Sequence, residues 1–370
     1  MNILQIVSSS RTSGAEKHVL VLSDRLRRHG HKVMAVCPSD GWLPAQLRDA
    51  GIPALEVAMR GPRSWASTFM LARLVRKHRI DLIHTHLTRA TYLGALVGRL
   101  TRLPVVSSCH VQTHDPAYRF LFHKQRNRII TVSDFVRNGL LAHGIRESQI
   151  QTIYNGTEFC LPGRAAGEDA VDGSLPVHAE LSLPPDAELV GLFARVDEFK
   201  GHPILVRAVR HVVAARPRAY FLCVGAVEAR MQRMLWETAA ADDVAERLRF
   251  TGVRNDVQRL MSAVDVVTLP SRYEACSMSI IEAMALGKPV VATRAGGNPE
   301  LVEDCATGLL IERTPEALAE ALICVLSDPE RRRRMGEAGR RRAEACFTDQ
   351  VMVGKIEAVY RELVECAGAA

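Results

Sequence analysis

Long apolar runs are absent from this sequence of 370 residues. No segment holds the roughly 20 consecutive apolar residues that a membrane-spanning helix needs. The opening segment, MNILQIVSSS, has neither a basic leader nor a long apolar core, so it does not resemble a secretory signal peptide. We therefore expect a cytoplasmic protein without a transmembrane anchor.

Paired cysteines are absent as well. The nine cysteines are scattered and form no CxxC pair, and several lie in apolar segments, as Cys37, Cys223 and Cys324 do. This spacing argues against a disulfide framework or a zinc site and favours reduced, buried thiols. The sequence also lacks a GxGxxG fingerprint, which argues against a dinucleotide-binding dehydrogenase.

The composition, with 47% hydrophobic and 24% charged residues, is typical of a globular protein, and the length suffices for two domains that each bury a core. A net charge of +7 suits phosphate-bearing substrates, an anionic membrane surface or nucleic acid, but we find no nucleic-acid-binding module and expect no such partner. Basic residues gather in 73–79 and 119–128. The second cluster, with Phe120 and Phe122 inside it, is either an interfacial patch for anionic lipid or a solvated helix face.

Apolar strands and amphipathic helices alternate along the chain. Residues 1–7 and 32–37 are predicted as strands on either side of a helix over 18–29, which implies a parallel pair with a right-handed crossover. After a segment rich in Gly and Pro over 161–186, which we interpret as a linker, the alternation resumes with a strand at 189–196. The sequence therefore predicts an α/β protein with two parallel-sheet domains.

The most informative segment is a turn between an apolar strand at 265–269 and a helical run that ends near Gly287. A helix N-terminus after a strand presents unpaired backbone N–H groups and the positive end of the helix dipole, and both attract anions. Glu274 and Glu282 flank this site and suit a ligand with hydroxyls on both sides of a phosphate, as in a nucleotide-sugar. Two plainer interpretations stay open: Ser279 and Glu282 form a capping box, and Glu274 is a loop acid in water.

Two cations bracket the loop after the strand at 189–196. Arg195 and Lys200 together would neutralise a diphosphate above a helix start. Taken by itself, however, Lys200 is better interpreted as a solvated loop lysine.

Histidines mark the ends of two predicted strands. His110 follows a strand at 104–108, and the carboxyl ends of parallel strands are where open sheets bind ligands. His84 and His86 form an HTH pair whose side chains point the same way, which suggests a metal site, but no third ligand is evident from the sequence. We therefore interpret the pair as a strand end near a ligand-binding cleft.

The motifs PSRYE, EAMALGKPVVAT, AGGNPELV and TGLLI, with an Asn-Gly turn at 155–156, resemble the E-x7-E segment and its surroundings in retaining glycosyltransferases of family 4. Those enzymes have the GT-B fold, in which two Rossmann-like domains face a central cleft. The resemblance covers nearly the whole chain. It departs from the family pattern at Ala194, at Thr157 and Glu158, and at 275–278, where relatives often have Gly or Pro.

The resemblance implies a role for each candidate residue. Glu274 would meet the hydroxyls of the transferred sugar, and Glu282 would meet the ribose. Arg195 and Lys200 would neutralise the diphosphate, and His110 would hold the transferred sugar. Further substrate contacts are expected at Gly14, Cys276, Ser277, Met278, Ser279 and Arg254.

The resemblance also implies a division into domains. Residues 1–165 would bind the acceptor and 166–347 the nucleotide-sugar, while a last helix over 348–370 would cross back to the first domain. The implied activity is transfer of a hexosyl group from a nucleoside diphosphate sugar, with a UDP-sugar as the default, to an acceptor hydroxyl with retained anomeric configuration.

The expected acceptor is a glycan or a lipid-linked molecule, in cell-surface polysaccharide, lipopolysaccharide or glycolipid synthesis, with peripheral contact to the inner face of an anionic membrane. The lack of a DxD motif predicts catalysis without a metal cofactor. Two alternatives stay open. One is a nucleotide-sugar epimerase or phosphorylase, and the other is a non-catalytic sugar-nucleotide-binding partner of another transferase.

Overall fold

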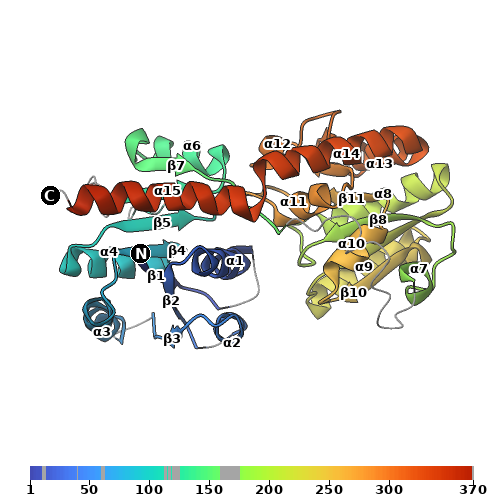
Figure 1. The fold of residues 1–370 in the computed structure, drawn as a ribbon. Coiled ribbons are helices and arrows are strands. Elements are labelled where there is room, and N and C mark those ends of the chain that lie inside the picture. The colour runs from blue at the N-terminus through green and yellow to red at the C-terminus, as the bar shows by residue number, and fades with distance from the viewer. Residues whose placement is uncertain are drawn as a thin grey trace. The chain divides into compact units, whose positions relative to one another are not determined.

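The computed structural model describes residues 1–10, 14–39, 41–59, 63–111, 115, 118, 126–158 and 176–368. The chain divides into two compact units, Met1–Gly156 with Thr348–Ala370, and Thr157–Phe347 (Figure 1). The boundary predicted at 165/166 lies outside the described residues. Each unit is a parallel sheet with its own helices.

The first unit is built on a seven-stranded sheet in the order β3-β2-β1-β4-β5-β6-β7, and the paired strands are parallel. The direction of winding reverses between β1 and β4, and such a switch point leaves a crevice at the carboxyl ends of the strands. The strands are β1 (Asn2–Val7), β2 (Lys32–Cys37), β3 (Ala54–Glu56), β4 (Leu82–His86), β5 (Val105–Cys109), β6 (Asn127–Thr131) and β7 (Ile150–Thr152). The helices before the second unit are α1 (Gly14–Arg28), α2 (Leu43–Asp49), α3 (Arg63–Lys77), α4 (Thr88–Thr101), α6 (Asp134–Ala142) and the short η1 (Glu147–Gln149).

The last helix, α15 (Asp349–Gly368), belongs to this first unit, and Figure 1 shows it as the long red helix beside the first sheet. Tyr360 is fully buried, and its hydroxyl lies 2.5 Å from His84 Nδ1 and 3.5 Å from the amide nitrogen of Gln5. An ion pair between Arg25 and Asp349 joins α15 to α1. The apolar side chains of α15 complete the core of the unit and are Met352, Val353, Ile356, Val359 and Leu363.

The second unit has a six-stranded sheet in the order β10-β9-β8-β11-β12-β13, which is the Rossmann order with its switch point between β8 and β11. Its strands are β8 (Glu188–Phe193), β9 (Ala219–Val224), β10 (Leu248–Gly252), β11 (Val266–Leu269), β12 (Val290–Thr293) and β13 (Gly308–Ile311). Its helices are α7 (Val177–Glu180), α8 (His202–Ala215), α9 (Ala229–Ala241), η2 (Ala245–Arg247), α10 (Val257–Ala263), α11 (Met278–Ala285), α12 (Asn298–Leu301), α13 (Pro315–Ser327) and α14 (Pro329–Cys346).

The structure corrects the sequence analysis in the segment interpreted as a linker. Residues 159–175 lie outside the described part of the chain, but α7 forms immediately after it and packs against α10. Glu180 at the end of α7 pairs with Arg254 at 2.8 Å and also with Arg259. A short helix held by ion pairs to distant residues leaves no local apolar period, so the sequence pattern did not reveal it.

Two further differences concern helices. Gly14 is the first residue of α1, so this helix begins four residues before the one predicted over 18–29. Helices α2 and α9 were not predicted, since each buries few apolar residues, such as Leu47 in α2 and Leu235 in α9. Among the described helices, none is both long enough and apolar enough to cross a membrane.

Candidate functional site

The turn after β11 leads into α11 at the switch point of the second sheet. Ser277 is the N-terminal cap of α11, and its hydroxyl accepts a hydrogen bond from the backbone N–H of Ile280 at 3.4 Å. The hydroxyl of Ser279 donates to the carbonyl of Phe193 at 2.5 Å, which ties the start of α11 to the end of β8. The alternative of a capping box formed by Ser279 and Glu282 is therefore wrong, because the cap lies two residues earlier. Half-buried Cys276 and Met278 flank Ser277, and half-buried Glu282 is the fifth residue of the helix.

Glu274 is not a loop acid in water. The residue is 9% exposed, and its carboxylate accepts a hydrogen bond from Lys200 Nζ at 2.7 Å. Its backbone carbonyl accepts from Gly297 N–H at 2.8 Å. Gly296 has a φ of +60°, and a Cβ at that position would overlap the backbone of Glu274. The backbone of this turn is thus packed so closely that it fixes where the carboxylate points.

The loop after β8 is held against the same turn. The carboxylate of Asp197 accepts from the backbone N–H of Lys200 at 2.8 Å and pairs with Arg195 at 2.8 Å. Gly201, with a φ of +84°, caps α8, and a Cβ there would overlap the carbonyl of Pro270. Glycine is required here by both the left-handed backbone and the close approach.

The structure therefore places four predicted site residues on the loop after β8, the turn after β11 and helix α11 of the second unit. Lys200 pairs with Glu274, Arg195 lies in the same loop as Lys200, and Glu282 lies on the helix that follows Glu274. The guanidinium-bearing side chain of Arg195 is 73% exposed, so its charge faces solvent and can meet a ligand. The arrangement offers cations, a carboxylate and the backbone N–H groups of a helix start, and this combination suits a polyol phosphate.

Arg254 occupies a different position. It follows β10 and pairs with Asp256 at 2.7 Å and with Glu180 at 2.8 Å. The hydrogen bond from Arg254 holds the pKa of Asp256 well below its usual range, and the same bond raises the pKa of Arg254. The described contacts of this guanidinium serve to anchor α7, and a role in binding substrate stays a prediction.

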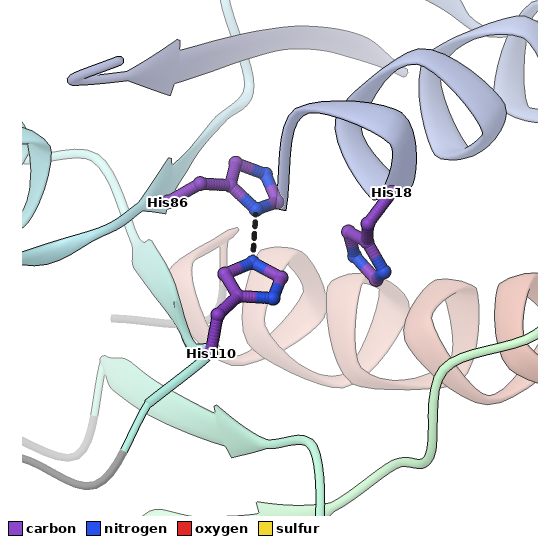
Figure 2. Close-up of side chains that lie close together, drawn as sticks. All are labelled: His18, His86 and His110. Carbon is purple, nitrogen blue, oxygen red and sulfur yellow. Dashed lines mark hydrogen bonds between the residues drawn. The ribbon is translucent and has the colours of Figure 1, made fainter. Parts of the chain in front are cut away.

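The predicted histidine of the first unit lies in a cluster. His110 follows β5, and its Nε2 lies 3.1 Å from Nδ1 of His86 at the end of β4 (Figure 2). Nε2 of His86 donates to the side-chain oxygen of Gln5 on β1 at 2.7 Å. Both nitrogens of His84 are engaged, with Tyr360 at 2.5 Å and with Ser108 at 2.8 Å. The cluster thus lies at the carboxyl end of neighbouring strands, at the switch point of the first sheet.

His18 on α1 joins this cluster, and the sequence analysis did not predict it. Its ring centroid lies 4.8 Å from that of His110 and 5.6 Å from that of His86. Burial lowers the pKa of His18 to about 4, and burial is also the main cause that lowers the pKa of His86 and of His110, with neighbouring histidines adding to it. These imidazoles are therefore neutral near pH 7. A histidine facing the same crevice from a helix start leaves no periodic signal in the sequence.

Family models match both units of the chain. Residues 12–159 match the family model described as Glycosyltransferase Family 4, and residues 177–342 match the model described as Glycosyl transferases group 1. This chain belongs to glycosyltransferase family 4. The family resemblance that the motifs indicated is thus confirmed for this glycosyltransferase.

Curated relatives extend the likeness. A D-inositol 3-phosphate glycosyltransferase of Segniliparus rotundus is 27% identical over 70% of this chain and 62% of its own length. A GDP-mannose-dependent monoacylated alpha-(1-6)-phosphatidylinositol monomannoside mannosyltransferase of Corynebacterium glutamicum is 34% identical over 47% of each chain. The glycosyltransferase thus spans about half to two thirds of the length of these two relatives.

Solved structures match the fold over its full length. A glycosyltransferase from Rickettsia africae superposes with a TM-score of 0.86 at 22% identity, covering 98% of both chains. Anabaena HepE in complex with UDP superposes with a TM-score of 0.85 at 23% identity, covering 98% of this chain and 100% of that one. The predicted GT-B fold of two Rossmann-like domains is therefore confirmed.

Proposed function

We propose that this glycosyltransferase moves a hexosyl group from a nucleoside diphosphate sugar to an acceptor hydroxyl with retention of the anomeric configuration. The observation that carries the proposal is the Lys200–Glu274 pair beside the start of α11, at the switch point of a Rossmann sheet. At this edge a nucleotide's phosphates would meet the cations Arg195 and Lys200 and the backbone N–H groups of a helix start. The family model that matches this unit supports the same assignment.

The chemistry to be assisted is departure of a diphosphate. The bond between the anomeric carbon and the phosphate oxygen breaks, a bond to the acceptor oxygen forms on the same face, and the acceptor's proton passes to the departing phosphate. Negative charge grows on that phosphate, and Arg195, Lys200 and the N–H groups around Ser277 are the groups that stabilise it. Glu274 holds the sugar hydroxyls and Glu282 the ribose. His110, in the first unit, is assigned to the transferred sugar, and no metal is needed in this scheme.

The donor is proposed as a UDP- or GDP-sugar. Both the solved structures and the curated relatives support this donor class. HepE structures hold UDP-glucose or UDP with glucose, and one curated relative is named for its use of GDP-mannose. Several relatives are named for D-inositol 3-phosphate. A polyol, glycan or lipid-linked acceptor in cell-surface polysaccharide, lipopolysaccharide or glycolipid synthesis agrees with these names.

We also propose that a surface on α3 and α4 contacts an anionic membrane. The two helices pack side by side (Figure 1), and neither contains an acidic residue. Phe69 is 66% exposed and Leu100 48% exposed, while Arg76 and Lys77 are exposed in the last turn of α3. Exposed apolar side chains among basic ones suit the boundary between lipid headgroups and acyl chains. The sequence-predicted patch at 119–128 lies almost entirely outside the described residues.

Vesicle co-sedimentation tests this surface. The full chain should bind vesicles that contain phosphatidylserine or phosphatidylglycerol and release them as salt rises, and a double variant with Phe69→Ser and Arg76→Glu should bind less. The matched control is Arg230→Glu on α9 of the second unit, which is also exposed. Equal binding by the two variants would contradict the assignment.

The transfer itself is tested with a panel of UDP- and GDP-sugars and candidate acceptors, with the anomeric configuration of the product read by NMR. The expected result is an acceptor glycoside with the donor's configuration, insensitive to chelator. An epimerised donor without acceptor consumption would favour the epimerase alternative. Binding without turnover of any donor would favour the non-catalytic alternative, and an inverted product would exclude the retaining mechanism.

A further inference from the structure

Three histidines of the first unit converge on one point. His18 comes from α1, His86 from the end of β4 and His110 from the residue after β5, and Figure 2 shows the three rings around a shared space. One ring nitrogen of each lies within 4.8 Å of the others. The switch point between β1 and β4 brings these separate elements together, so the cluster occupies the ligand-binding edge of the sheet.

The ring of His18 is buried without hydrogen bonds to the residues that the structure describes. The side chain is buried with 6% exposure, and neither ring nitrogen has a hydrogen-bond partner among the described residues. Asn155 lies near enough to raise its pKa somewhat, but it does not reach hydrogen-bond geometry with either nitrogen. A buried polar atom left without a partner costs about 1–3 kcal/mol, and a ligand at the centre of the cluster would remove this cost.

His86 is already oriented as a ligand. Its Nε2 donates to the side-chain oxygen of Gln5 at 2.7 Å, which places the lone pair on Nδ1, facing His110. Metal-binding histidines characteristically donate their other ring N–H to a neighbouring oxygen in this way. Without a metal, the Nε2–H group of His110 donates a hydrogen bond to Nδ1 of His86. With a metal, that proton moves to Nδ1 of His110, and the ring stays neutral.

We propose that His18, His86 and His110 form a site for a transition metal of the Zn²⁺ class. Nitrogens at about 2.0–2.1 Å from a tetrahedral zinc lie roughly 3.3 Å apart, so His86 and His110, at 3.1 Å, already have the required spacing. The ring nitrogen of His18, which lies within 4.8 Å of the other two, would have to move closer to reach this spacing. Three imidazoles without a carboxylate suit Zn²⁺, Ni²⁺ or Cu²⁺ better than Mg²⁺, Ca²⁺ or Mn²⁺. A fourth position would stay open to water or to a ligand oxygen.

Metal binding here has a consequence for turnover. A bound ion would occupy Nε2 of His110, the residue proposed to hold the transferred sugar, and the metal would then inhibit transfer. This consequence rests on the proposed function. The binding site itself does not, because its geometry involves only the first unit.

Cobalt titration of the full chain, freed of metal by chelator, tests the site. The wild type should bind a single equivalent of Co²⁺ with the intense visible absorption of a tetrahedral complex, and Zn²⁺ should displace it. His18→Cys should keep binding and add a thiolate-to-cobalt charge-transfer band in the near ultraviolet. His18→Gln should weaken metal binding by roughly tenfold or more. Loss of a residue that only hydrogen-bonds to a metal ligand typically costs about 10–100-fold in affinity, so loss of a ligand itself should cost at least as much. The control His78→Gln, at an exposed histidine outside the cluster, should bind like the wild type.

Circular dichroism establishes that each variant is folded, and the wild type alone decides the matter if a variant is not. Absence of saturable Co²⁺ and Zn²⁺ binding by the wild type would overturn the proposal, as would equal affinity in folded His18→Gln. In the activity arm, Zn²⁺ should inhibit transfer by the wild type and by His78→Gln. Stoichiometric binding by a chain that transfers no sugar would support the metal site while refuting the proposed function.

Discussion

In both units the candidate site lies at the carboxyl ends of the strands of a parallel sheet, but the side chains there are neutral in one unit and charged in the other. In the first unit the strand ends at the switch point between β1 and β4 carry neutral imidazoles, with a hydrogen bond between His86 and His110. In the second, the crevice between β8 and β11 holds the charged pair of Lys200 and Glu274 beside the start of α11. Strand order selects where a ligand site lies, and the side chains at the strand ends select what it binds.

Acidification should separate the two units most strongly. Burial holds the pKa of His18 at about 4 and lowers the pKa of His84, His86 and His110 below 6.5. Since an unfolded histidine titrates near 6.5, the unfolded chain takes up more protons below that pH, and the folded unit loses stability until the pH reaches the folded pKa values. His18 alone accounts for about 3 kcal/mol between pH 6.5 and 4.

Urea unfolding at several pH values, with chelator present and with peptide-resolved hydrogen exchange as the readout, measures each unit. His202 in the second unit is also buried with a pKa lowered to about 4, so that unit should weaken as well, but less. Loss of protection in β1, β4 and β5 should precede loss in β8 and β11 as the pH falls. Simultaneous loss in both sheets, or earlier loss in the second, would contradict the account.

Removing a charge from the second site should abolish most activity. Lys200→Ala and Glu274→Gln should each lower kcat by roughly 10²–10³-fold, because charge developing on the diphosphate or the sugar loses its partner. Steady-state rates with the donor identified from the panel measure the effect. Arg230→Ala, an exposed cation on α9, is the matched control and should retain the wild-type rate. A small effect in both site variants would place the reaction elsewhere.

The packing of the second site can be tested without touching its charges. Gly201→Ala should cost about 3 kcal/mol of unfolding free energy, since it adds a steric overlap with Pro270 to the roughly 1 kcal/mol of a left-handed backbone. Gly252→Ala is the control, with a φ of +70° but nothing within 4 Å of the new Cβ. Denaturant unfolding compares the two. Equal losses would show that the contact between the loop and the turn is not close.

The smallest effect is expected in the first unit, where Tyr360 of α15 contacts His84. Tyr360→Phe removes the hydroxyl that bonds His84 and should cost about 1–2 kcal/mol, because buried partners are left unpaired. Tyr92→Phe removes a hydroxyl that donates to Asp115 at 2.6 Å on an exposed side chain, and it should cost less than about 0.5 kcal/mol. Thermal or urea unfolding in chelator measures the loss of stability in both variants. A larger loss for Tyr92→Phe than for Tyr360→Phe would contradict the expectation.

Much of the fold was predictable because its signals are local. Parallel strands that are buried on both faces read as apolar runs, and β8 and β11 were found in this way. The position of Glu274 followed from the strand, turn and helix around it. Helix α7 was missed because its anchoring depends on Arg254 and Arg259, which lie far away in the sequence.

The pairs within each site were less predictable than the residues. The sequence indicated Lys200 and Glu274 separately, but their contact at 2.7 Å depends on the close approach at Gly201. In the same way, His86 and His110 were visible as strand ends, whereas the third histidine, His18, came from a helix start across the crevice. Long-range contacts of this kind have no period along the chain.

Calorimetric titration of UDP and GDP into the full chain tests the central claim most directly, namely that the charged site of the second unit binds the nucleoside diphosphate. We predict saturable binding of at least one of these nucleotides by the wild type, weakened roughly tenfold or more by Lys200→Ala and unchanged by His110→Ala. Absence of binding by the wild type, or loss of binding in His110→Ala with full retention in Lys200→Ala, would contradict it.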